Sequence, residues 1–189
     1  MQVLPLACHP STPCPWVSTV GVRVDVLDRR RIVFYYEVEG DIDALQLPPQ
    51  RRSAPGHELW RHTCFEAFLR TPDARSYVEL NFSPSSEWAV YGFDAYREGM
   101  RTIDLEPPPR IICRRRADRL EADVEVLLTI PELQGDLRIA VAAVLEDTRG
   151  RLCYWALAHP SGRPDFHHAD GFVLALGSPE GAAASGVSQ

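Results

Sequence analysis

Hydrophobic and polar residues alternate along three runs in the middle of the chain, at Thr63–Arg70, Tyr77–Ser83 and Glu87–Phe93. A period of two places successive side chains on opposite faces of a β-strand. Turn-forming residues separate the runs, Thr-Pro-Asp at 71–73 and Ser-Pro-Ser-Ser at 83–86. The pattern therefore predicts a meander of three antiparallel strands that packs one face on a hydrophobic core.

The same alternation continues on both sides of this meander and predicts three hairpins. The segment 136–146 is the most apolar of these strands, so we expect it near the centre of its sheet. Shorter strands are expected at Met1–Leu6 and Phe172–Leu176. The hairpins pair Val20–Val26 with Ile32–Glu39, Arg110–Arg116 with Arg119–Ile130, and Asp136–Glu146 with Arg151–His159.

Roughly ten short strands without a recurrent helical pattern favour an all-β fold, an antiparallel two-sheet β-sandwich of the jelly-roll kind. The chain has 189 residues, a length that fits one domain. We expect residues 1–177 to form that domain. Residues 178–189 are small and polar, so this tail is expected to be disordered.

The second face of the meander carries polar residues that stand between large aromatic ones. Glu66 and Asn81 fall on neighbouring predicted strands, and Glu79 lies two residues before Asn81. Buried together, these groups would need partners such as Arg61 or Arg97. The set is therefore either a structural ion pair or an anchor for a ligand.

Two blocks of sequence resemble a known family. The first block reads Thr-Cys-Phe-Glu at 63–66, Tyr-x-Glu-x-Asn-Phe-Ser-Pro at 77–84 and Glu-Trp-x-x-Tyr at 87–91. The second runs from Tyr154-Trp155-Ala156-Leu157 through His159-Pro160 to Pro164-Asp165-Phe166-His167-His168. Together they resemble the bacterial DOMON-like proteins, which are similar to family 9 carbohydrate-binding modules and to DOMON domains that hold haem or sugars. The resemblance covers nearly the whole chain and implies a sandwich that binds a small ligand without catalysis.

Aromatic and polar residues of these blocks are suited to a sugar. Aromatic rings pack on the apolar face of a pyranose, while charged and amide side chains bind its hydroxyl groups. Family 9 modules grip the sugar between two tryptophans, and Trp60 with Trp155 or Trp88 would be such a pair here. The alternative for each tryptophan is packing in the core. The candidate ligand-binding residues are Trp60, Arg61, Glu66, Glu79, Asn81, Trp88, Arg97, Trp155 and His159.

The segment from His159 to Asp170 offers a second interpretation, a metal-dependent enzyme. His159, Asp165, His167 and His168 are residue types that bind zinc or iron. Adjacent histidines in an extended chain point in opposite directions, so His167 and His168 would rarely bind one ion. The alternative is that one histidine forms a hydrogen bond to buried loop backbone while another is exposed.

Three further readings remain open. Haem, the other DOMON ligand, would need Met100 with His62 or His159 as axial ligands. Glu66 and Glu79 could form the carboxylate pair of a glycoside hydrolase. A protein-interaction module would present an exposed apolar patch without a pocket. We expect the non-catalytic module with no cofactor.

Composition excludes several classes of function. All 20 basic residues are arginine, so the chain can form no Schiff base through lysine and has no Walker-type phosphate loop. The net charge of −6 and the absence of a basic stripe argue against a nucleic-acid partner. No apolar run approaches the ~18 residues of a membrane helix. The five cysteines lack metal-type spacing, and no signal peptide is evident, so we expect free thiols and a cytoplasmic location.

Overall fold

The computed structural model describes residues 2–28 and 30–177, so the predicted disordered tail at 178–189 lies outside the described residues. The expected all-β class is confirmed, because strands and three short 3-10 turns are the regular elements of the described chain. None of the helices among these residues could span a membrane. The strands are β1 (Leu4–Cys8), β2 (Val17–Val26), β3 (Arg31–Gly40), β4 (Ala54–Pro55), β5 (Cys64–Arg70), β6 (Tyr77–Phe82), β7 (Glu87–Phe93), β8 (Arg101–Thr102), β9 (Arg110–Arg115), β10 (Arg119–Leu127), β11 (Leu137–Glu146), β12 (Leu152–Ala156) and β13 (Leu174–Leu176), and the 3-10 turns are η1 (Ile42–Ala44), η2 (Leu59–Arg61) and η3 (Ala169–Gly171).

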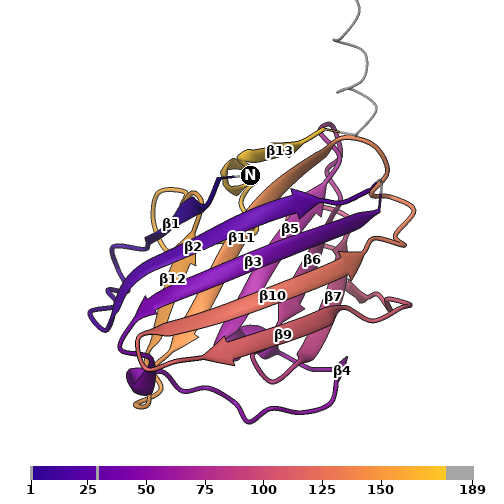
Figure 1. Cartoon of the computed structure of the whole chain (residues 1–189). Helices are drawn as coiled ribbons and strands as arrows, with labels where there is room; N and C mark the ends of the chain where they lie inside the picture. Colours follow the sequence, from indigo (N-terminus) through magenta and orange to yellow (C-terminus); the bar gives the residue numbers. More distant parts are fainter. Residues whose placement is uncertain (1, 29, 178–189) are drawn as a thin grey trace, which may run out of the picture.

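Hydrogen bonds join the strands into one curled sheet in the order β4-β7-β6-β5-β11-β12-β1-β2-β3-β10-β9, with β13 beside β11 and β8 beside β7. The expected pair of separate antiparallel sheets is corrected in two respects. β1 pairs with β12 through Ala7 and with β2 through Leu6, which makes the sheet continuous. β4 runs parallel to β7, which makes it mixed. Figure 1 shows β2, β3, β10 and β9 in front of β11, β5, β6 and β7.

Aromatic side chains from both halves of the sheet meet in the core. The ring of Tyr36 on β3 stacks on Phe65 of β5 at 4.7 Å, and Phe34 lies 6.2 Å from Phe82 of β6. The buried hydroxyl of Tyr36 donates a hydrogen bond of 2.9 Å to the backbone oxygen of Glu66. Full burial of each such ring contributes about 1.5–3 kcal/mol, so these contacts hold the halves together.

Strand positions follow the hydrophobic alternation closely. The meander forms as β5, β6 and β7, and β11 lies between β5 and β12, as expected for the most apolar strand. The short parallel strand β4 falls within a segment whose prolines give no strand pattern, and its pairing with β7 was not predicted.

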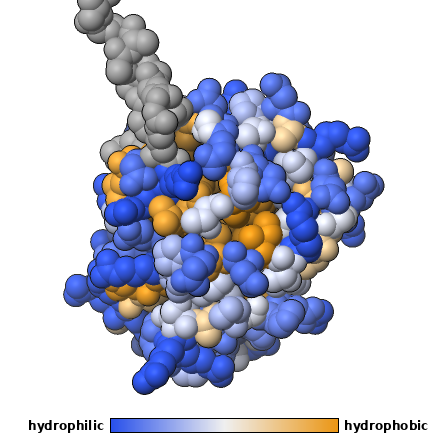
Figure 2. Space-filling view, turned by 90° about the vertical axis from the view of Figure 1, so that its right-hand side faces the viewer, coloured by the Kyte–Doolittle hydropathy of each residue, from blue (hydrophilic) through white to orange (hydrophobic). Residues whose placement is uncertain are grey.

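Seen from the right-hand side of Figure 1, apolar side chains show in the middle of the surface, surrounded by hydrophilic ones (Figure 2).

A second, smaller apolar cluster lies on the outer face of the β12-β11-β5-β6-β7 half. Its side chains point away from the main core, because they alternate with core residues along each strand. The segment 157–173, called the covering segment below, packs over this face. The cluster consists of Phe68, Tyr77, Ala89, Tyr91, Phe93, Ala140 and Phe172, with Leu59, Trp60 and Phe166 packed against it.

Candidate functional site

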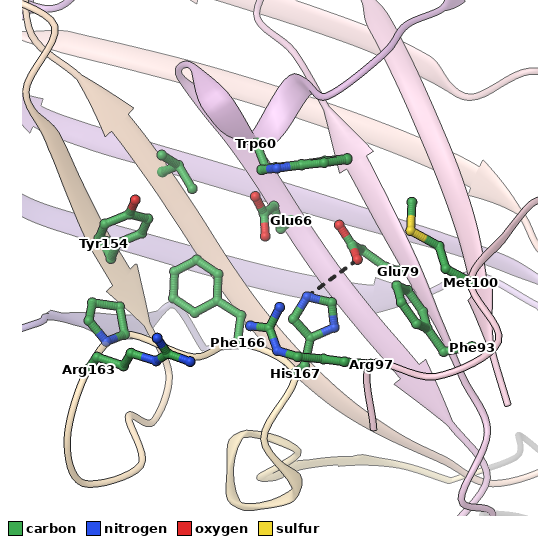
Figure 3. A pocket seen from close by; sticks show the side chains of 12 residues that line it. Trp60, Glu66, Glu79, Phe93, Arg97, Met100, Tyr154, Arg163, Phe166 and His167 are labelled. Carbon is green, nitrogen blue, oxygen red and sulfur yellow. Dashed lines mark ion pairs between the residues drawn. The ribbon is translucent and has the colours of Figure 1, made fainter. Parts of the chain in front are cut away.

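A cavity of about 460 Å³ opens between this outer face and the covering segment. Side chains of β5, β6, β7, β11 and β12 form its floor, and Figure 3 shows them pointing into the space. Carboxylates and rings alternate around it, so the cavity offers both hydrogen-bonding groups and flat apolar surfaces. The lining residues are Trp60, Glu66, Glu79, Phe93, Arg97, Met100, Val144, Tyr154, Arg163, Pro164, Phe166 and His167.

Glu66 lies at the bottom of this cavity on β5. Its neighbours in the sheet are Asn81 on β6 and Ala142 on β11, and only 2% of its surface is exposed. Burial, together with the nearby carboxylate of Glu79, raises the pKa of Glu66 well above its ordinary value. Within the described chain, Oε1 of Glu66 has no hydrogen-bond partner. A buried polar atom without a partner costs about 1–3 kcal/mol, so the hydrogen-bonding capacity of this oxygen is unused within the described chain.

Glu79 on β6 is the second carboxylate of the cavity, and it has partners. Nδ2 of Asn81 donates a 2.7 Å hydrogen bond to its Oε1, and Nε2 of His167 lies 3.7 Å from its Oε2 (Figure 3). Burial raises the pKa of Glu79 to about 7, against the opposing effects of Asn81 and Arg97. Asn81 itself lies beneath the cavity, where the thiol of Cys64 approaches its Oδ1 at 3.5 Å.

His167 connects the covering segment to the floor. Its Nδ1 lies 2.7 Å from the hydroxyl of Tyr77, which also accepts a hydrogen bond from the backbone N–H of Arg97. Burial and the positive charge of Arg97 lower the pKa of His167 to about 4, so its ring is neutral at pH 7. With its proton on Nε2, the ring accepts from Tyr77 and points its N–H toward Glu79.

Charged and apolar groups line the mouth of the cavity. Arg97 donates a 2.8 Å hydrogen bond to Asp165, and the hydroxyl of Tyr96 bonds the other oxygen of that carboxylate. Burial opposes ionisation of Asp165, but these two hydrogen bonds outweigh it and lower its pKa. Met100 is 54% exposed, and Arg163 has no ion-pair partner among residues 2–28 and 30–177. The mouth therefore carries positive charge and an exposed apolar side chain.

Four of the nine candidate residues line the cavity, namely Trp60, Glu66, Glu79 and Arg97. Asn81 supports Glu79 from below. The remaining four lie elsewhere: Trp88, Trp155, Arg61 and His159 are absent from its walls.

The assignment of Trp88 and Trp155 to ligand binding is corrected. Trp88 is 4% exposed and Trp155 7%, and both belong to the main core. Each alternates along its strand with a residue of the outer face, so its ring points inward. Arg61 is exposed and pairs with Glu58 at 2.9 Å. Nε2 of His159 donates a 2.8 Å hydrogen bond to the backbone oxygen of Ala7 on β1, and so fixes the start of the covering segment.

The residues of the alternative metal site do not converge. Asp165 is bound to Arg97, His167 faces Tyr77, and His168 accepts a hydrogen bond from the backbone of Asp170. The part of the chain that the structure describes contains no group of three or more His, Cys, Asp or Glu side chains placed to hold a metal ion. The expectation of no cofactor stays a prediction.

The two candidate axial pairs for haem are also not assembled. Met100 lines the cavity, whereas His62 pairs with Glu146 at 2.7 Å and lines a different cavity, and His159 is held at Ala7. Neither histidine contributes to the walls around Met100.

Several lining residues were not predicted as ligand-binding. Phe93, Tyr154 and Phe166 form aromatic walls, and His167 was considered only as a metal ligand. Tyr154 and Phe166 fall in the second resembling block, between 154 and 168, which was the available signal. Their partners come from distant strands, so spacing along the chain could not place them.

Comparison with solved structures identifies a protein with a similar fold. A provisionally assigned carbohydrate-binding protein from Bacteroides uniformis ATCC 8492 aligns with a TM-score of 0.66 and 15% identity, covering 90% of this chain and 83% of its own. A family 9 carbohydrate-binding module from Caldicellulosiruptor kristjanssonii aligns in complex with cellotriose, at TM-score 0.49, 13% identity, 85% of this chain and 74% of the module. A family 9 module from Caldicellulosiruptor kristjanssonii in complex with glucose aligns with a TM-score of 0.46 and 13% identity, covering 83% of this chain and 76% of the module. No protein-family model and no curated protein matches the sequence.

Proposed function

We propose that this protein is a non-catalytic module of the DOMON-like type that binds a saccharide in the cavity over β5 and β6. The observation that carries the proposal is the buried carboxylate of Glu66, whose Oε1 has no partner within the described chain and which lies in the wall of an open cavity. A sugar hydroxyl would satisfy that oxygen and remove the penalty of its burial.

The rings around Glu66 suit the rest of a sugar. Trp60, Tyr154 and Phe166 supply flat apolar surfaces, and Trp60 is held edge-on against Tyr91 with 5.5 Å between ring centres. Aromatic faces pack well on the C–H groups of a pyranose, and fixed polar groups then set its orientation. The cavity of about 460 Å³ falls within the usual range of roughly 300–1,000 Å³ for small-ligand sites.

Two other observations support a saccharide. The Bacteroides uniformis protein that shares the fold is provisionally assigned to carbohydrate binding. The blocks at 63–91 and 154–168, which carry the resemblance to DOMON-like proteins, also supply most of the cavity walls.

The experiment is titration calorimetry of the purified protein against neutral monosaccharides and oligosaccharides. Trp60→Ala removes the flat surface and should weaken the affinity about tenfold or more, a loss of about 1.4 kcal/mol or more. Glu66→Gln should weaken it similarly without lowering the free energy of unfolding, because the amide keeps the shape of the side chain and carries no charge to bury.

Trp155→Phe is the matched control, since the indole of Trp155 points into the core. It should keep the saccharide affinity within about twofold. Equal losses in Trp155→Phe and Trp60→Ala, or no saccharide binding by the unmodified protein, would overturn the proposed site. Hydrolysis of chromogenic glycosides that disappears in Glu66→Gln would contradict the non-catalytic role.

A further inference from the structure

A second cavity, of about 420 Å³, lies beside the first on the same outer face. His167 contributes to the walls of both. The second cavity differs in its charge, because its walls include Arg70, Arg75 and His168 and no carboxylate. It therefore presents cationic and hydrogen-bond-donating groups together.

Arg70, the last residue of β5, has a nitrogen that lacks an acceptor. Its Nε is buried and makes no hydrogen bond within residues 2–28 and 30–177. Its guanidinium lies 4.5 Å from the ring centre of Phe172, which also lines the cavity. This contact holds the side chain in place without satisfying the N–H group.

Arg70 also faces a like charge. Its direct partner across the sheet is Arg138 of β11, and both point to the outer face because Phe68 and Ala140, two residues along, pair on that face. Among the residues that the structure describes, no ion pair includes Arg70, Arg75 or Arg138. Arg70 thus lies opposite a like charge, and neither Arg70 nor Arg75 has an ion-pair partner within that part of the chain.

Two carboxylates of the covering segment have partners of their own. Asp165 is bound by Arg97 and by the hydroxyl of Tyr96. Asp170 lies 3.5 Å from His168. Because like charges opposite one another destabilise a sheet, an anion bound beside Arg70 would reduce its repulsion with Arg138.

We propose that the second cavity binds an oxyanion, that is a carboxylate, phosphate or sulfate group, between Arg70 and Arg75. The planar guanidinium of arginine matches two oxygens of such a group. His168 adds a donor, since its Nδ1 accepts from the backbone of Asp170 and a neutral ring then carries its proton on Nε2. The oxyanion is either a free small anion or the acidic substituent of a sugar that occupies the first cavity.

The test is calorimetric titration at constant ionic strength with sodium phosphate, sodium sulfate, glucuronate and glucose. The unmodified protein should bind at least one of the three anions with a dissociation constant of about 1 mM or below. Arg70→Gln should weaken this binding about tenfold or more, and Arg75→Gln several-fold. Arg75 is exposed, so its replacement leaves folding intact even if Arg70→Gln lowers the melting temperature.

Arg149→Gln is the matched control, because Arg149 is exposed in the turn at the opposite end of β11 and the charge change is identical. It should leave anion affinity within about twofold. Phosphate or sulfate binding that is lost in Arg75→Gln while glucose binding is unchanged identifies a free anion. Glucuronate binding that exceeds both glucose and phosphate, with the excess lost in Arg75→Gln, identifies an acidic sugar.

Failure of all three anions to bind, no loss in Arg75→Gln, or an equal loss in Arg149→Gln would overturn the oxyanion site. Phosphate and sulfate test it without any saccharide, so this outcome is independent of whether neutral sugars bind in the first cavity.

Discussion

The two halves of the curled sheet carry acidic residues on their outer faces in different surroundings. On β10, Asp123 is partly exposed and receives a 2.7 Å hydrogen bond from Arg114. On β6, Glu79 is only 5% exposed and its pKa is raised to about 7. Both residues alternate with core residues along their strands, so alternation alone does not distinguish them.

The difference arises from what lies above each strand. The covering segment packs over β5 and β6, and it brings Phe166 and His167 against their outer face. The outer face of β10 instead has arginine partners at the surface, where an ion pair contributes about 0–1 kcal/mol. Burial that outweighs nearby favourable partners, rather than position in a strand, therefore marks the carboxylates of the site.

The largest effect should come from Glu79→Gln. The raised pKa means that folded protein holds this proton more tightly than unfolded protein, whose pKa is near 4.5. The resulting stabilisation is present below pH 4.5 and is lost as the pH rises toward 7. Each pKa unit corresponds to about 1.4 kcal/mol, so the unfolding free energy of Glu79→Gln should gain on the unmodified protein by on the order of 3 kcal/mol between pH 4.5 and 8. Urea unfolding across this range measures it.

The control on the other half of the sheet is Glu125→Gln, which removes a carboxylate 3.5 Å from Arg31. It should change the unfolding free energy by less than about 1 kcal/mol. If Glu79→Gln and Glu125→Gln change the unfolding free energy by the same amount at every pH, the carboxylates of the two outer faces do not differ in burial as the comparison requires.

A smaller effect on the unfolding free energy is expected from Phe166→Ala, which removes an aromatic ring from the covering segment. Phe166 is partly buried, with its ring 5.8 Å from Tyr154 and 6.5 Å from Phe68. We expect a loss of about 1–2 kcal/mol in unfolding free energy and a weaker saccharide affinity. Tyr35→Ala, on the outer face of β3 beneath Arg23, should cost about 0.5–1 kcal/mol and leave the affinity unchanged. If the saccharide affinity is unchanged in Phe166→Ala, the covering segment does not contribute to saccharide binding.

The smallest effect should follow from Arg119→Ala on β10. Arg119 donates to Glu37 at 3.0 Å and to Glu39 at 2.7 Å, all at the partly exposed surface. Its removal should lower the unfolding free energy by about 1 kcal/mol or less, with a smaller difference at high salt. Thermal unfolding at low and high sodium chloride measures this difference. A loss of unfolding free energy above about 2 kcal/mol would show that the ion pairs on the outer face of β10 and β3 are not weak.

The sequence was sufficient to predict most of the strands and part of the candidate site. Glu66, Glu79 and Asn81 stand at alternating positions of adjacent strands, so their common face followed from the pattern. Trp60 and Arg97 join them because they flank the same meander. Local periodicity carries this information, since neighbouring strands in a meander meet without a long connection.

The rest depended on contacts between distant parts of the chain. Tyr154 and Trp155 are adjacent aromatic residues of β12, and only its register with β11 decides which one points inward. Phe166 and His167 lie in a segment without regular structure, and their place is set by Phe68 and Tyr77, about 90 residues earlier. The single continuous sheet likewise required the pairing of β1 with β12, which no local pattern specifies.

That pairing has a consequence for the order in which the protein folds. Ala7 of β1 meets Ala156 of β12, so nearly 150 residues separate two strands that must join before the sheet is continuous. The loop-closure entropy of such a contact grows only slowly with length, but long-range pairing slows the search for the native topology. During synthesis on a ribosome, β1 and β2 emerge early, whereas β12 arrives only after most of the chain. We therefore infer that the seam between β1 and β12 forms late, after the hairpin of β2 with β3 and the meander of β5, β6 and β7.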